Sequence, residues 1–251
     1  MIDFYMLHGF LGRGSDWEPL KEKIRKKYKD SFYRQPDLFF QPHHDLSSQF
    51  DMPQWAINFN AWARETQASL ENRKRVLMGY SMGGRLALHA LLHRQSQWDA
   101  AIIMSANPGI FWSTEEIQKR RNWDEIWAQD FLNKDWTQLI EKWHQLPVFS
   151  GDPQPYRLLE EQFSRAALSL AFKNWSVLNH GFELEDLKKI SIPVLWVVGE
   201  RDQKYCHYYE YLKKEKYIDD YIVIPRIGHR ILRAEDPELL LGLLFFLDRF
   251  L

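Results

Sequence analysis

The sequence has little cysteine, no excess of either charge and no long apolar run. Its 251 residues include one cysteine, Cys206, so no disulfide can form within the chain and nothing indicates an oxidising compartment. The 33 basic and 34 acidic residues balance, which argues against a general binder of nucleic acid or of membrane surfaces. The first residues resemble neither a signal peptide nor a membrane span, so we expect a cytoplasmic, soluble protein.

The most informative stretch covers residues 75–92. An apolar run at 76–78 is typical of a strand buried on both faces, and apolar residues then recur at helical spacing. Between them, residues 79–83 read G-Y-S-M-G, which matches the G-x-S-x-G nucleophile elbow in its strand–turn–helix context. The two glycines allow a close approach of strand and helix, with the serine on a strained turn. The pattern predicts Ser81 as a nucleophile.

Strand and helix patterns alternate along the chain except in one long segment. The alternation predicts an α/β fold with a mostly parallel sheet, right-handed crossovers and helices on both faces. Residues 107–189 are helical in character throughout and too long for a loop, so we predict a helical lid inserted into a core of residues 1–106 and 190–251. The predicted strands are 2–7, 31–38, 76–78, 100–105, 192–199 and 221–225, and the main predicted helices are 53–71, 114–133, 136–145, 156–175 and 237–251.

Two loops supply partners for a serine nucleophile. A serine hydroxyl needs a base, which in turn needs an orienting acid, and in this fold the order along the chain is Ser, Asp, His. Asp202 follows the strand at 192–199, and His229 follows the strand at 221–225. In isolation each could be an ordinary turn or surface residue, but their order after the elbow favours a triad. Glu200 and Asp236 are the alternative acids.

The loop H-G-F-L-G at residues 8–12 directly follows the first predicted strand. A glycine-flanked loop at this place contributes half of the oxyanion hole in α/β-hydrolases, which would make the backbone N–H groups of Phe10 and Met82 the two donors. The alternative is an ordinary strand-to-helix turn.

His43, His44 and Asp45 have side chains of the types that bind metal ions. Adjacent histidines on a loop point apart, and no further ligand follows at a metal-binding spacing. We therefore expect a surface loop and no metal.

Arg85 is unusual because it lies four residues after Ser81, one turn along the same face of the helix. A buried guanidinium requires an anionic partner. That partner is either a protein carboxylate in a buried ion pair or a substrate carboxylate held by two hydrogen bonds. Further cations follow in the insertion, and each alone is typical of a solvated surface; together they suit a substrate with several carboxylates. They are Lys119, Arg120, Arg121, Arg157 and Arg165.

The ordered motifs resemble one known family. The elbow G-Y-S-M-G-G-R at 79–85 is similar to that of the 2-succinyl-6-hydroxy-2,4-cyclohexadiene-1-carboxylate (SHCHC) synthases of menaquinone biosynthesis, which belong to the α/β-hydrolase superfamily. The resemblance covers most of the chain. Its other motifs are L-H-G-F-L-G at 7–12 with Asp16 and Trp17, N-P-G at 107–109, Arg120 and Arg121 with Asp124 and Trp127, Trp143 with Q-L-P-V-F at 145–149, G-E-R-D-Q-K-Y at 199–205, and I-P-R-I-G-H at 224–229.

The resemblance implies a lyase that eliminates pyruvate and needs no metal or organic cofactor. The triad would be Ser81, Asp202 and His229, with Ser81 acting as a base. Arg85, one or both of Arg120 and Arg121, and Arg165 would bind carboxylates, and Tyr80 and Trp143 would line the pocket. The partner would be a small molecule with several carboxylates rather than a nucleic acid or membrane, and the protein a monomer or small homo-oligomer with a sheet of about six or seven strands.

One loop departs from the family pattern. Where the family has D-x-P-G-H-G after the second strand, this chain has Asp37 followed by L-F-F-Q-P-H-H-D, which calls the shape of the pocket into question. Two alternative functions also remain: a serine hydrolase, either an esterase or a carbon–carbon bond hydrolase acting on a small carboxylate-bearing substrate, and a non-enzymatic ligand-binding protein.

Overall fold

A parallel sheet of six strands runs through the core of the computed structural model, which describes the chain apart from residues 41–42, 67–72, 112, 153–156, 234–235 and 251. The order across the sheet is β2-β1-β3-β4-β5-β6, and every neighbouring pair is parallel. This confirms the predicted fold class. The strands are β1 (Ile2–Leu7), β2 (Phe32–Arg34), β3 (Lys74–Tyr80), β4 (Ala100–Met104), β5 (Val194–Gly199) and β6 (Tyr221–Ile224).

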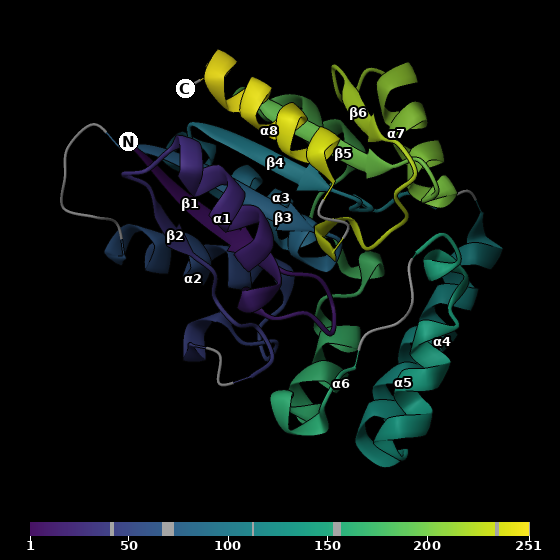
Figure 1. Ribbon diagram of the computed structural model, residues 1–251. Helices are drawn as coiled ribbons and strands as arrows, with labels where there is room; N and C mark the ends of the chain where they lie inside the picture. Colours follow the sequence, from purple (N-terminus) through teal and green to yellow (C-terminus); the bar gives the residue numbers. More distant parts are fainter. Residues whose placement is uncertain (41–42, 67–72, 112, 153–156, 234–235, 251) are drawn as a thin grey trace.

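Helices cover both faces of the sheet, as parallel strands require (Figure 1). On one face, apolar side chains of α1 and α8 pack with one set of strand residues. On the other face, the second set packs with α2, α3 and α7. These helices are α1 (Glu18–Lys27), α2 (Met52–Glu65), α3 (Met82–Arg94), α7 (Gln203–Lys214) and α8 (Pro237–Phe250). Among the described residues, no helix is both long and apolar enough to cross a bilayer.

Three helices and several short 3-10 turns connect β4 to β5. The helices are α4 (Thr114–Asn133), α5 (Trp136–His144) and α6 (Arg165–Asn174). They gather beyond the end of the sheet towards which the strand arrows point (Figure 1). The segment therefore lies where the carboxyl ends of the strands open, which is where ligands bind in open α/β sheets.

Most predicted elements are confirmed, but three are shorter than predicted, and one of these, the helix predicted at 53–71, ends at Glu65. The helix predicted at 156–175 begins only at Arg165, because the Ser164 side chain caps it by accepting a hydrogen bond from the N–H of Ala167. The strand predicted at 31–38 ends at Arg34, two residues before Pro36, which has no N–H for the ladder. The ends of three predicted helices, at 67–71, 156 and 251, lie outside the described residues.

The turn from β3 into α3 depends on glycines that permit backbone contact. A Cβ atom on Gly79 would lie 2.5 Å from the carbonyl oxygen of Gly83, and one on Gly83 would lie 2.2 Å from the carbonyl oxygen of Leu7. Both distances are far below van der Waals contact, and both neighbours are backbone atoms that cannot turn aside. Only glycine therefore fits where β1, β3 and α3 meet.

We expect Gly83→Ala to destabilise the fold by about 3 kcal/mol or more, because overpacking against backbone forces strands and helix apart. The measurement is urea unfolding followed by circular dichroism. Gly242→Ala in α8 is the control, since its Cβ would meet only the mobile end of the Ile222 side chain, and alanine favours a helix by about 1 kcal/mol. Equal stabilities for the two variants would contradict the prediction.

Candidate active site

Ser81, His229 and Asp202 meet at the carboxyl ends of the strands. Ser81 Oγ lies 3.0 Å from His229 Nε2, and His229 Nδ1 lies 2.7 Å from Asp202 Oδ2. The side chains of His229 and Asp202 are buried at 5% and 1% exposure, so water competes little for their contact. The structure thus brings together the three residues that the sequence predicted as a triad.

The two alternative acids are engaged elsewhere. Glu200 accepts a hydrogen bond from the backbone N–H of Arg226, and Asp236 accepts one from that of Glu238. Neither contact involves His229, so the geometry favours Asp202 as the acid partner.

Strained backbone conformations occur in the loops that follow the strands. Ser81 has φ 53° and ψ −113°, a conformation that L-residues rarely adopt, directly between β3 and α3. Of the five non-glycine residues with positive φ in the described chain, four lie in loops just after a strand: Leu11, Ser81, Ser105 and Arg226. Such strain persists only when surrounding packing holds it, which is typical of functional sites.

A cavity of about 470 Å³ opens over Ser81 and extends beneath the segment between β4 and β5. This volume falls in the usual range for small-molecule sites, about 300–1,000 Å³. Trp143 from α5 contributes one wall and contacts Phe10, with ring centres 5.0 Å apart. The predicted site residues that line the cavity are Phe10, Tyr80, Ser81, Met82, Arg85, Arg120, Trp143 and His229. Met82 is the first residue of α3, where backbone N–H groups have no partner within the helix.

Arg85 lies in this cavity, partly exposed to it. Its Nη2 donates to the carbonyl oxygen of Trp175 at 2.7 Å, whereas its Nε is buried and has no hydrogen-bond partner. No ion pair joins Arg85 to a carboxylate among the residues that the structure describes. Burial, and then the nearby charge of Arg120, lower the pKa of Arg85 to about 10, so the group stays charged near neutral pH. A cation that lines a cavity and has no carboxylate partner is suited to bind an anion.

The three lid arginines differ in their surroundings. Arg120 lines the cavity, pairs with Asp124 at 2.8 Å and stacks on Trp123. Arg121 is exposed on α4 and lies outside the cavity lining. Arg165 also lies outside the lining; its Nε pairs with Glu160 at 3.0 Å, and its Nη2 donates to a backbone carbonyl. Arg120 is therefore the one predicted lid arginine that the structure brings to the site.

The structure adds cavity cations that the sequence analysis missed. Arg230 follows His229 directly, is 7% exposed and lines the cavity. Lys204 follows the Asp202 loop, and burial followed by the Arg120 charge lowers its pKa. Their adjacency to the two triad loops was the available signal, because residues next to a catalytic loop residue often face the same cavity.

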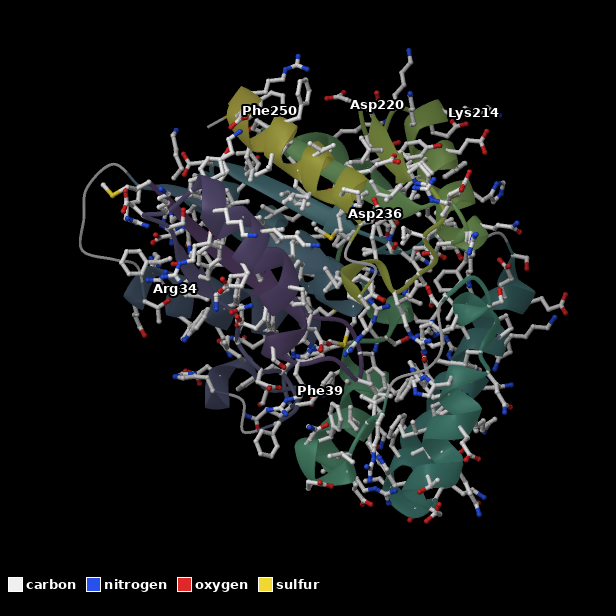
Figure 2. The ribbon with its side chains drawn as sticks, in the orientation of Figure 1. Arg34, Phe39, Lys214, Asp220, Asp236 and Phe250 are labelled. Atoms are coloured by element: carbon white, nitrogen blue, oxygen red, sulfur yellow. The ribbon has the colours of Figure 1, made fainter. Side chains whose placement is uncertain are left out.

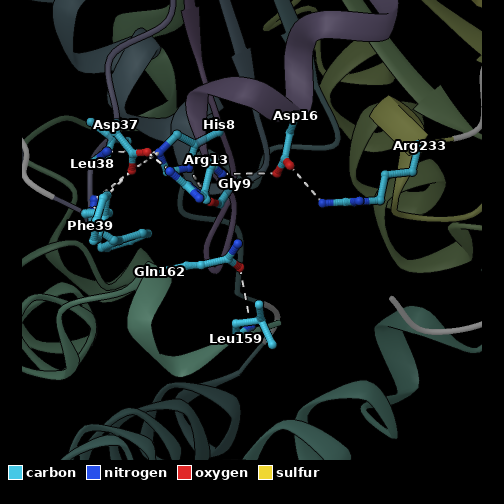
Figure 3. Close-up of polar contacts among 11 residues, drawn as sticks. His8, Gly9, Arg13, Asp16, Asp37, Leu38, Phe39, Leu159, Gln162 and Arg233 are labelled. Carbon is cyan, nitrogen blue, oxygen red and sulfur yellow. Dashed lines mark hydrogen bonds and ion pairs between the residues drawn. The ribbon is translucent and has the colours of Figure 1, made fainter. Parts of the chain in front are cut away.

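The divergent loop after β2 is held by an ordered polar network (Figure 3). His8 Nε2 accepts from the N–H of Leu38 at 3.0 Å, and burial lowers the pKa of His8, so the imidazole stays neutral. Asp37 accepts from Arg13 and from the N–H of Phe40. The loop thus keeps its aspartate anchored without the glycines of the family pattern.

Phe39, which stands at the proline position of the D-x-P-G-H-G pattern counted from Asp37, is buried and lies beside α6 (Figure 2). Its ring centre lies 5.4 Å from that of Phe10 and 6.0 Å from that of Trp175, and its carbonyl accepts from the N–H of Ser164. The substitution therefore fills space between the Phe10 loop and the lid with an aromatic ring.

The prediction of a surface loop around His43 and Asp45 agrees with the residues that the structure describes. His43 is exposed, with Nδ1 3.9 Å from Asp45. Among the described residues, no group of three His, Cys, Asp or Glu side chains is arranged to hold a metal ion.

The buried His89 and the half-buried His180 stack one helical turn beyond Arg85. His89 Nε2 lies 3.2 Å from His180 Nδ1, and the rings are nearly parallel. Burial and the Arg85 charge lower the pKa of His89 to about 4, and burial and the His89 charge keep that of His180 well below its ordinary value. Both are therefore neutral when folded, whereas in the unfolded chain they protonate near pH 6.5.

We expect the free energy of unfolding to decrease as pH falls from about 6.5 towards 4. In this range His89 and His180 bind protons in the unfolded chain but stay neutral in the folded protein. The His89 shift alone corresponds to about 3 kcal/mol. Urea unfolding at each pH gives the slope, and His89→Asn is expected to flatten it. His43→Asn, at an exposed position, is the control. An unchanged slope in His89→Asn would contradict this origin of acid sensitivity.

Comparison with known proteins agrees with the fold. The profile of the Alpha/beta hydrolase family matches residues 4–242, so the chain belongs to that family. Sequence relatives include the putative SHCHC synthase of Haemophilus influenzae, 29% identical over 91% of this chain and 90% of that protein. The SHCHC synthase of Photorhabdus laumondii is 28% identical over 91% and 79%. The predicted resemblance to SHCHC synthases, and with it the prediction of an enzyme, is thereby confirmed.

Solved structures with the same fold include MenH from S. aureus, with a TM-score of 0.79 and 21% identity over 99% of this chain and 94% of that chain. A thermophilic esterase from Thermogutta terrifontis has a TM-score of 0.72 and 17% identity over 100% and 90%. At these identities the likeness concerns the fold alone, and proteins of different activity share it.

Proposed function

We propose that the chain is a lyase of menaquinone biosynthesis that eliminates pyruvate from 2-succinyl-5-enolpyruvyl-6-hydroxy-3-cyclohexene-1-carboxylate to give SHCHC. The observation that carries the proposal is Arg85, a cation that lines the same cavity as Ser81 and has no carboxylate partner among the described residues. Arg120 adds a second cation to the same space. A substrate with several carboxylates matches this charge, and the sequence relatives are named for such a reaction.

In the proposed mechanism Ser81 acts as the base. His229, oriented by Asp202, accepts the hydroxyl proton, and the Ser81 oxygen removes a proton from the substrate ring. The electron pair of that C–H bond forms a new ring double bond, the existing ring double bond shifts by one position, and the C–O bond to the enolpyruvyl group breaks with its electron pair leaving on the oxygen. The departing enolate takes up a proton and leaves as pyruvate. The N–H groups of Phe10 and Met82 stabilise the oxyanion that develops meanwhile.

The remaining roles concern binding. Arg85 and Arg120 hold substrate carboxylates and so fix the reacting C–H bond near Ser81. Tyr80 and Trp143 line the pocket. Residues 107–189 act as a lid that excludes water from the cavity, which strengthens each charge interaction inside it.

A serine hydrolase acting on a small carboxylate-bearing substrate is the second candidate. The Ser81–His229–Asp202 geometry supports acyl transfer as well as proton abstraction, and an esterase is among the proteins that share the fold. The cavity cations favour the same charged substrates in both cases. The reaction itself therefore has to be measured.

We expect the purified protein to release pyruvate from the enolpyruvyl substrate and to turn over simple esters slowly or not at all. A lactate dehydrogenase-coupled assay measures pyruvate, and p-nitrophenyl acetate measures esterase activity. Ser81→Ala is expected to abolish pyruvate release. Fast ester turnover without any pyruvate would overturn the lyase and favour the hydrolase.

We expect Arg85→Ala to lower kcat/KM for pyruvate release by 100-fold or more, since loss of a charged partner in a buried contact costs about 2–5 kcal/mol. Arg94→Ala is the matched control, because it removes an exposed arginine at the end of the same helix. Near-normal activity of Arg85→Ala would mean that Arg85 has only a structural role.

A further inference from the structure

A turn of the lid lies directly against the loop that carries His229. A Cβ atom on Gly228 would lie 2.3 Å from Asp152 Oδ1 and 2.8 Å from the carbonyl carbon of Gly151. On its other side, Gly151 approaches Arg201 of the Asp202 loop just as closely. The lid turn at residues 149–152 therefore contacts both loops that carry His229 and Asp202.

Arg230 makes most of the polar contacts across this junction. Its backbone N–H donates to Asp152 Oδ1 at 2.9 Å, and its Nη2 lies 2.7 Å from His144 Nδ1 at the end of α5. Its guanidinium carbon lies 3.9 Å from the ring centre of Phe149, a cation–π contact. Arg230, next to His229, thus contacts three residues of the lid, which are Asp152, His144 and Phe149.

Asp152 brings a second carboxylate to the neighbourhood of His229. Its side chain is 1% exposed, Oδ2 lies 3.9 Å from Arg230 Nε, and Oδ2 has no hydrogen-bond partner among the residues that the structure describes. Burial raises the pKa of Asp152, while the Arg230 N–H and the charges of His229 and Arg230 act in the opposite direction. A buried carboxylate with one unused oxygen is costly unless a nearby positive charge compensates it.

The groups that face His229 from each neighbouring element are few. Asp202 bonds Nδ1 and Ser81 contacts Nε2. The rings of Tyr205, Tyr80 and Phe149 lie at 4.7, 5.6 and 5.9 Å between centres. Asp152 also interacts electrostatically with His229, and of these groups Phe149 and Asp152 come from the lid.

We propose that Asp152 and Arg230 form a lid-to-core pair that positions His229, so that the reactivity of Ser81 depends on the lid turn being seated. Asp152 and Arg230 are positioning residues in this scheme, because they act through His229. When His229 takes the Ser81 proton, the Asp152 charge stabilises the imidazolium alongside Asp202. The inference rests on the proposed function only through the role of His229 as a base, and not on the substrate.

The test uses labelling of Ser81 by a fluorophosphonate, which reports the reactivity of the serine without any substrate. We expect Asp152→Asn and Arg230→Gln each to slow labelling by roughly 10- to 100-fold, the scale of a small misplacement of a catalytic group. Arg230→Lys, which keeps the charge but not the planar fork, is expected to recover part of the rate. The double variant is expected to be no slower than the slower single variant, because the two residues act as a unit.

The pH profile separates positioning from general loss of structure. Labelling requires neutral His229, so the rate falls at low pH as the imidazole protonates. Removing the Asp152 charge takes away an interaction that favours the imidazolium, so we expect the acid limb of the labelling profile to move to lower pH in Asp152→Asn. A merely structural defect would lower the rate without moving that limb.

Asp130→Asn is the matched control, because Asp130 pairs with Lys142 within the lid and does not contact the His229 loop. It is expected to label at the wild-type rate, and circular dichroism checks that each variant is folded. Wild-type labelling rates and an unmoved acid limb in Asp152→Asn would overturn the inference. A wild-type protein that labels but releases no pyruvate would overturn the proposed lyase and leave this inference intact.

Discussion

The close approach of β1, β3 and α3 is the constraint on which the rest of the site depends. Gly79 and Gly83 admit backbone atoms where any side chain would collide, and the turn between them holds Ser81 at φ 53°. Because the sheet is parallel, the loops after β5 and β6 end at the same edge, and they bring Asp202 and His229 to Ser81. A change that separated strand from helix would therefore move Ser81 away from His229, even though neither of these residues had changed.

Charge inside the cavity works against stability and favours ligand binding. Arg85 is desolvated and lies near Arg120, and each charge makes the other less favourable, as the lowered pKa of Arg85 indicates. Asp124 compensates Arg120 directly, whereas Arg85 relies on a backbone carbonyl. The folded protein thus keeps an electrostatic cost that an anionic ligand would relieve. This is the physical basis for expecting carboxylate substrates rather than neutral esters.

Aromatic side chains form one set of contacts between residues 107–189 and the rest of the chain. Phe10, from the loop after β1, packs against Trp143 and Phe172 of the lid and against Phe39 of the divergent loop. The same ring therefore connects the backbone N–H proposed for the oxyanion hole to the position of the lid. Phe39, at the proline position of the family pattern, adds to this packing, while His8 and Asp37 keep the loop in place.

The sequence by itself determined the elements whose signals are local. The G-x-S-x-G turn, the strands on either side of the lid and the places of Asp202 and His229 just after strands all follow from short patterns, and the structure brings those residues together. Only the tertiary structure decided which cations face the cavity. Neighbouring residues on a helix point about 100° apart, so Arg120 and Arg121 cannot both face one side, and the side is chosen by how α4 packs on α6. Arg165 was expected in the site and Arg230 was not, because the contacts of both depend on where the lid rests on the core.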